Sequence, residues 1–184
     1  MPLATRPAEP AAVVCAVLAD TPATADLARQ RLAALLGPAA GQTALYPFDY
    51  TAYYDEEMGA GLVKELVGFG DRLDPAGLGR LKRATMRLEV ELATTAAGRL
   101  RRRANLDPGL VTVESLVLAT TKYTGHRVCI GPDLYAEVTL LYAQGAYRPL
   151  PWTYPDYRRD DVQALLQGLR AALLAERRLR QQGR

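Results

Sequence analysis

The chain has few of the side chains that most often bind metal ions or act as nucleophiles. Its 184 residues include one histidine, His126, two cysteines, Cys15 and Cys129, and one serine, Ser115. A CxxC pair and a second cluster of soft ligands are both missing, so we expect no metal site. Both cysteines lie in apolar runs, where a free cysteine packs as a small hydrophobic residue. Because no GxSxG surrounds Ser115, we do not expect a Ser-His-Asp triad.

Glycine-rich phosphate loops and long apolar runs are missing as well. Neither GxxxxGK[ST] nor GxGxxG follows the first apolar run, where the sequence reads ADTPAT. A nucleotide held by a glycine-rich loop is therefore not expected. No stretch approaches the roughly twenty apolar residues that a membrane span needs. The run AAVVCAVLA is short for a signal core, and Glu9 and Pro10 interrupt the basic region before it. We expect a cytoplasmic protein without a membrane partner.

Charge of one sign is not in large excess. The chain has 23 basic and 20 acidic residues, which does not favour a dedicated nucleic-acid binder. Only three of the basic residues are lysines, so a lysine kept in an apolar neighbourhood, such as Lys122, indicates that a compact ammonium is required there. A composition of 49% hydrophobic and 23% charged residues is typical of a globular chain, and the length predicts one domain.

Local patterns predict strands and helices after a flexible arm over residues 1–11. The continuous apolar run Val13–Leu18 is typical of a strand covered on both faces. Thr21 and Pro22 then predict the start of a helix, which Gly37-Pro38 ends. Up to Gly109 the patterns predict a short strand and an ordered loop over 43–61, a strand over 62–69, a helix from Asp74-Pro75 to about Arg103 and a turn over Asn105–Gly109. Beyond it they predict a short helix over 113–121, strands from Val128 into a hairpin over 134–150, an irregular segment over 151–157 and a helix from Asp160.

These elements predict a single α+β domain over residues 12–184. We expect a mixed, mostly antiparallel sheet of about five or six strands, with helices packed mainly against one face. The strand over Val13–Leu18 should be central because it has no polar face. A doubly wound parallel sheet is the alternative, and the hairpin pattern of the C-terminal half argues against it.

The tyrosines predict where a ligand would bind. All ten lie within 46–54 or 123–157, so their rings either plug one side of the sheet or line a pocket that stacks a planar ligand. Polar residues in loops and at element ends supply the chemistry. We expect Lys122, His126 and Arg127 to lie near Asp107 and Glu137. The opposing wall should carry Tyr50, Tyr154 and Asp156, and Asn105 should also contact the ligand.

Each of these residues has an expected role. His126 would move a proton, and Lys122 and Arg127 would hold an anion. Asp107 and Glu137 would position a hydroxyl or orient the imidazole, so the candidate catalytic residues are His126, Lys122, Asp107 and Glu137. The alternative is a satisfied polar network that only pins the loops.

Two classes of function remain open on these residues. The first is an enzyme or binding protein for a small anionic ligand, phosphorylated or nucleotide-like, with no cofactor identified. The second is a non-catalytic adaptor that docks a protein or an RNA. In that second case the run Arg99–Arg103 would contact RNA, although such a run is also typical of a solvated helix end.

Several segments together resemble one known family. The blocks YPFDYTAYYDEEMG, NLDPG, LVLATTKYTGHR, YAEVTLLY and PLPWTYPDYR are similar, in that order, to the signature blocks of the prokaryotic domain-of-unknown-function family 4416. The resemblance covers roughly residues 12–175. It implies a small cytosolic single-domain protein with no established activity and offers no catalytic residues to carry over. Some members carry a GTP-binding label, which no phosphate loop in this chain supports.

Overall fold

The computed structural model describes residues 7–96 and 98–182. Its strands are β1 (Ala11–Ala19), β2 (Ala39–Gln42), β3 (Tyr46–Pro47), β4 (Val63–Leu73), β5 (Thr94–Ala96), β6 (Arg99–Arg101), β7 (Ala104–Val111), β8 (Ser115–Thr120), β9 (Val128–Gly131), β10 (Leu134–Ala143) and β11 (Ala146–Pro149). Its helices are α1 (Pro22–Leu36), α2 (Asp55–Met58), α3 (Leu78–Leu92) and α4 (Asp160–Gln182), with short 3₁₀ turns η1 (Pro75–Gly77) and η2 (Pro155–Arg158).

The main sheet has nine strands in the order β11-β10-β8-β7-β1-β4-β2, with β3 added to β4 and β9 added to β10. Every strand pair within the described residues is antiparallel. The α+β class is therefore confirmed, whereas the parallel component and the count of five or six strands were wrong. The missed strands are β2, which at four residues is too short to show a period of two, and β7 and β8, whose segments were expected to form a turn and a short helix.

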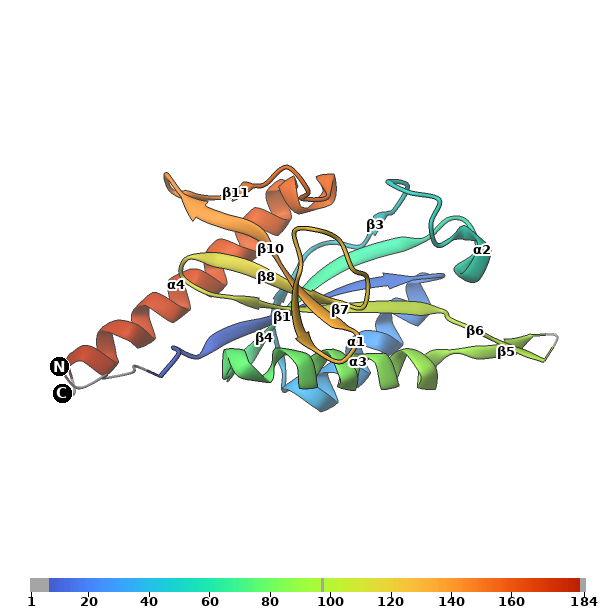
Figure 1. Ribbon diagram of the computed structural model, residues 1–184, viewed down its shortest axis with the longest axis horizontal. Helices are drawn as coiled ribbons and strands as arrows, with labels where there is room; N and C mark the ends of the chain where they lie inside the picture. Colours follow the sequence, from blue (N-terminus) through green and yellow to red (C-terminus); the bar gives the residue numbers. More distant parts are fainter. Residues whose placement is uncertain (1–6, 97, 183–184) are drawn as a thin grey trace.

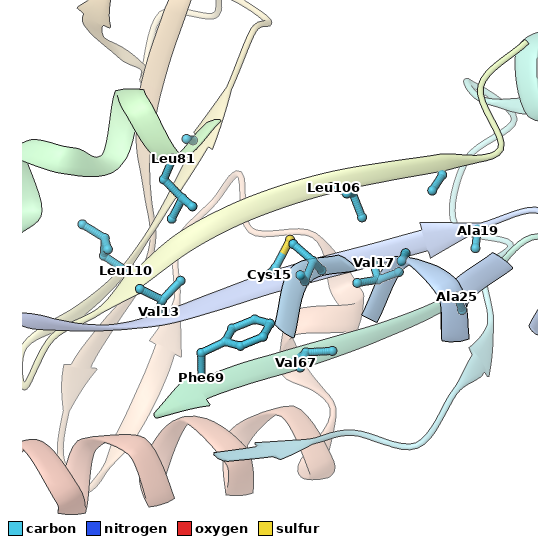
Figure 2. Close-up of a cluster of buried hydrophobic side chains, with 14 of the residues drawn as sticks. Val13, Cys15, Val17, Ala19, Ala25, Val67, Phe69, Leu81, Leu106 and Leu110 are labelled. Atoms are coloured by element: carbon cyan, nitrogen blue, oxygen red, sulfur yellow. The ribbon is translucent and has the colours of Figure 1, made fainter. Parts of the chain in front are cut away.

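Helices cover both faces of this sheet. All nine residues of β1 are buried, and β7 and β4 flank it, so the expected central strand is confirmed. Its odd-numbered side chains, such as Cys15, pack with α1 and α3, as the cluster in Figure 2 shows. Its even-numbered side chains, such as Val14, pack against Leu166 and Leu169 of α4. In Figure 1 α1 and α3 lie together below the sheet, and α4, in red, lies apart from them. The expectation of helices mainly on one face was wrong.

Three local predictions were also wrong, all between residues 93 and 121. Helix α3 ends at Leu92, and the strands β5 and β6 that follow it pair with each other and project from the body in Figure 1. The segment Asn105–Gly109 lies within β7 and is no turn, because pairing with β1 holds it extended. Residues 115–120 form β8 instead of a helix, because tertiary pairing with β10 overrides a pattern of apolar residues that also fits a short helix.

The N-terminal arm is described only in part, since residues 1–6 lie outside the described residues. Glu9 forms an ion pair with Arg177 of α4 at 2.7 Å, and Ala11 already belongs to β1. Among the described helices, none combines the length and the apolar content needed to cross a membrane.

Candidate functional site

The candidate site begins with a split in the sheet between β7 and β8. The two strands pair over only three residues each. Beyond them, side chains of α3 take the place of the partner strand: Lys82 Nζ donates to the Leu106 carbonyl at 2.8 Å, and the Leu106 N–H donates to Glu89 Oε1 at 2.8 Å. Pro108, two residues further along, faces the same edge and has no N–H to donate. Proline and the α3 side chains together explain why β8 leaves β7 here.

Asp107 lies at the split, bound on both oxygens. Its Oδ1 accepts a hydrogen bond from Lys82 Nζ at 2.9 Å, and its Oδ2 accepts one from Asn105 Nδ2 at 2.8 Å. Burial acts to raise the pKa of Asp107, but the charge and hydrogen bond of Lys82 outweigh it and hold that pKa below its ordinary value. Burial acts in turn to lower the pKa of Lys82, and its carboxylate neighbours, Asp107 first, raise it. Both groups therefore stay charged, side by side, at neutral pH.

A cavity of about 210 Å³ opens at this split. Segments far apart in the sequence converge on it. They are the loop before α2, the strands β4, β7, β8 and β10, the segment that follows β8 and the residues around η2. The cavity is lined by Phe48, Thr51, Tyr53, Tyr54, Lys64, Asp107, Leu118, Ala119, Thr120, Lys122, Arg127, Glu137, Tyr154 and Tyr157. A hollow of about 180 Å³ shares Tyr53, Tyr54, Asp107, Thr120 and Lys122 with it, and Lys82, Glu89, Arg102 and Asn105 also line that hollow. A concave site with aromatic walls and a few charged groups is the usual form of a small-molecule site.

Lys122 is the exposed cation of this cavity. Its Nζ lies 3.7 Å from the ring centroid of Tyr53 and 4.9 Å from that of Tyr54. Within the described part of the chain its ammonium forms no ion pair with a carboxylate, and its one side-chain hydrogen bond is a long one of 3.5 Å to Tyr54 Oη. Cation–π contacts orient an ammonium without neutralising its charge. Lys122 is thus placed to meet an anion at the cavity.

Arg127 and His126 are held by one buried carboxylate. Glu137 Oε2 accepts from Arg127 Nε at 2.8 Å and lies 2.8 Å from His126 Nε2. The imidazole also stacks on the Trp152 ring, with centroids 4.7 Å apart and planes 12° apart. Arg127 and Glu137 line the cavity, whereas His126 contacts Glu137 but does not line the cavity.

On another wall Lys64 and Asp156 form a second buried ion pair. Lys64 Nζ donates to Asp156 Oδ2 at 2.5 Å, and the hydroxyl of Tyr46 donates to the same oxygen at 3.1 Å. The side chain of Asp156 is 1% exposed and that of Lys64 is 12% exposed. Lys64 lines the cavity between the rings of Phe48 and Tyr157, with its Nζ 4.9 and 5.0 Å from their centroids.

The basic run proposed for RNA is divided by the fold. Arg102 pairs with Glu57 of α2 at 2.5 Å, and Arg103 pairs with Asp20 at 2.8 Å. Only Arg99 and Arg101 remain exposed, on β6. Half of the expected RNA-binding surface therefore supports the fold, and Arg102 fixes α2 beside the cavity.

The sequence-predicted residues are brought together only in part. Lys122, Arg127, Asp107, Glu137 and Tyr154 line the cavity, and Asn105 lines the adjoining hollow. The remaining three do not line either space. His126 contacts Glu137, Asp156 is buried and bonded to Lys64, and Tyr50 is 42% exposed beside Phe48.

Sequence reasoning missed Lys64 and Lys82. Lys64 falls within a strand and Lys82 within an amphipathic helix, where a charged residue is typical of the solvated face. The signal that could have found them is the scarcity of lysine, which was applied to Lys122 alone. The chain has three lysines against twenty arginines, and all three lie on the cavity or the adjoining hollow.

The described residues contain no group of three or more His, Cys, Asp or Glu side chains that could hold a metal ion. Searches of the curated proteins and of the solved structures returned no significant match. The family model described as Domain of unknown function (DUF4416) matches residues 9–172, which include every residue that lines the cavity. The chain is therefore a member of the DUF4416 family.

Proposed function

We propose that this protein binds a small anionic ligand in the cavity at the sheet split. The observation that carries the proposal is Lys122, an ammonium oriented by two tyrosine rings at the cavity without a carboxylate partner in the described chain. A phosphate or carboxylate group of the ligand would complete its contacts. Arg127 adds a second cation on the same cavity, with Glu137 fixing its guanidinium.

Asp107 would receive the opposite end of such a ligand. It is an ionised carboxylate that lines the cavity, so it accepts an N–H or O–H donor and repels a second anion. Burial raises the pKa of Tyr54 and of Tyr157, so both phenols stay protonated at neutral pH and can donate to an oxyanion. The preferred ligand therefore combines an anionic group with hydroxyl or amino donors, as sugar phosphates and nucleotides do.

His126 takes a positioning role in this proposal. Because it contacts Glu137 and does not line the cavity, it would act on the ligand through Glu137 and Arg127. A change of His126 to Gln keeps one hydrogen bond to Glu137, so we expect a modest weakening of binding.

A thermal-shift and calorimetry screen over nucleotides, sugar phosphates and carboxylate metabolites tests the proposal. For any compound that binds, Lys122→Met should weaken affinity at least about tenfold, the equivalent of roughly 1.5 kcal/mol for one hydrogen bond to a charged group. Arg178→Met, which removes an exposed charge from α4, is the matched control and should change nothing. If no anion stabilises the protein, or if Lys122→Met binds as tightly as the parent, the proposal is wrong.

A further inference from the structure

The three lysines of the chain share one region, and lysine offers chemistry that arginine lacks. Lys64 and Lys122 line the cavity, and Lys82 and Lys122 line the adjoining hollow. A guanidinium stays protonated and is not a nucleophile, whereas an amine that loses its proton attacks carbonyl carbons. A chain that otherwise uses arginine about seven times as often has kept amines where a ligand would bind.

Their surroundings assign different roles to the three amines. Lys82 is 4% exposed and holds Asp107, Glu89 and the Leu106 carbonyl together, so its ammonium is committed to the fold. Lys122 is exposed and suits an electrostatic contact. Lys64 is the amine that is both largely buried and open to the cavity, with aromatic rings beside it.

Asp156 can act as the proton acceptor for Lys64. Both of its hydrogen bonds, from Lys64 and from Tyr46, fall on Oδ2, and Oδ1 is buried without a hydrogen-bond partner among the described residues. A buried carboxylate oxygen without a donor is costly, and a proton on that carboxyl group relieves the cost. Transfer of one proton from the ammonium to Asp156 converts the ion pair into a neutral acid and a neutral amine, and the neutral amine can attack a carbonyl carbon.

We propose that Lys64 forms a reversible imine with an aldehyde or ketone group of the ligand. The inference rests on the proposed function, because the same cavity holds the ligand and Lys122 and Arg127 hold its anionic group. It narrows the ligand to a small anion that carries a carbonyl group, such as a keto acid or a sugar phosphate in its open form.

The step balances without an oxidant or a reductant. Lys64 gives a proton to Asp156, and its free electron pair forms the C–N bond as the carbonyl π bond opens. The attacking nitrogen then passes one of its two remaining protons to the oxygen, which becomes a hydroxyl. Loss of that hydroxyl as water, with a proton returned by Asp156, leaves the protonated C=N bond. One water is released for each imine formed, and hydrolysis reverses the step.

Borohydride trapping with intact-mass measurement tests the inference. The probes are pyruvate and glyceraldehyde 3-phosphate, and the matched compounds without a carbonyl group are lactate and glycerol 3-phosphate. We expect at least one carbonyl probe to add its own mass less one oxygen atom, once per chain, with peptide mapping placing the adduct on Lys64. The other two lysines and the terminal amine serve as internal controls for unspecific labelling.

Two variants separate chemistry from folding. Lys64→Arg keeps the positive charge opposite Asp156 but cannot form an imine, so it should remain folded and lose the adduct. Asp156→Asn keeps the size of the side chain and should slow trapping at least tenfold, because the proton acceptor is gone.

The imine proposal is wrong if no adduct is trapped. It is also wrong if the adduct forms on Lys122 or the terminal amine and is as abundant in Lys64→Arg as in the parent protein. If both carbonyl probes and their matched compounds then stabilise the protein equally, the anion site survives without it. If none of the four compounds, nor any anion of the wider screen, stabilises the protein or labels it, both proposals fail.

Discussion

Replacing Lys82 by methionine should destabilise the protein severely. The substitution keeps an unbranched apolar stem and removes the ammonium, whose Nζ is 2.9 Å from Asp107 Oδ1 and 3.6 Å from Glu89 Oε1. Both carboxylates lose their buried cation, and the Leu106 carbonyl loses its 2.8 Å hydrogen bond. Breaking a buried ion pair by removing one partner costs about 3–5 kcal/mol, so we expect a loss of that size in the free energy of unfolding.

Urea denaturation at neutral pH measures this loss. Arg87→Met, an exposed substitution on the same helix, is the control and should stay within about 0.5 kcal/mol of the parent. Adding Asp107→Asn to Lys82→Met removes one of the two carboxylates that Lys82 neutralises, so the double variant should recover part of the stability. Recovery of this kind identifies uncompensated charge, and not lost packing, as the cause.

The pH dependence has a defined sign. Lys82 holds the pKa of Asp107 below its ordinary value of 3.8 in the folded protein, against the raising effect of burial. The stabilisation from Asp107 is therefore complete above that value and is lost as the pH falls through the folded pKa. Lys82→Met lacks this stabilisation, so its deficit should be largest near neutral pH and should shrink in acid. A deficit below about 1 kcal/mol, or one that does not change with pH, would refute this account of the split.

Two further predictions concern the same region. Gly109→Ala should lower the free energy of unfolding, measured by urea denaturation, by about 1–3 kcal/mol, because the added methyl group would lie 2.6 Å from Leu118 Cδ2 and 2.8 Å from the Val117 carbonyl. An unchanged denaturation midpoint would contradict the close approach of β7 and β8. If the protein binds RNA through the exposed strand β6, replacing both Arg99 and Arg101 by Ala should weaken RNA binding and reduce its dependence on salt without lowering the melting temperature. RNA binding that does not depend on salt would exclude RNA as a partner.

The parts of the fold that could be predicted are those that local chemistry decides. Residues 22–36 have a threonine cap, a proline at the first position and a glycine after the last, and α1 has these bounds. The apolar stripe of α4 was equally clear. Periodicity shows that a helix has a buried stripe but not which face of the sheet receives it, so the placement of α4 opposite α1 and α3 could not be deduced.

The site was predictable where polar residues stand in loops and hidden where they stand in regular elements. Lys122 and Arg127 belong to an irregular segment, and the cavity includes both. Asp107 was expected near them because residues 105–109 were predicted to form a turn, but these residues belong to strand β7. His126 was assigned the proton transfer because it is the only histidine, yet its ring contacts Glu137 and Trp152 and does not line the cavity.

The split in the sheet connects stability to access. If β8 followed β7 further in the same register, Thr120 would lie opposite Asp107 and the strands would close the opening. Pro108 prevents this because it has no N–H for the ladder, and the hydrogen bonds lost at Leu106 are replaced by Lys82 and Glu89 of α3. An apolar pair at those two positions would leave the Leu106 backbone groups buried without partners, so the charges are required by the opening itself. Lys82, which helps to hold the split open, is therefore also the residue that keeps Asp107 ionised at the cavity.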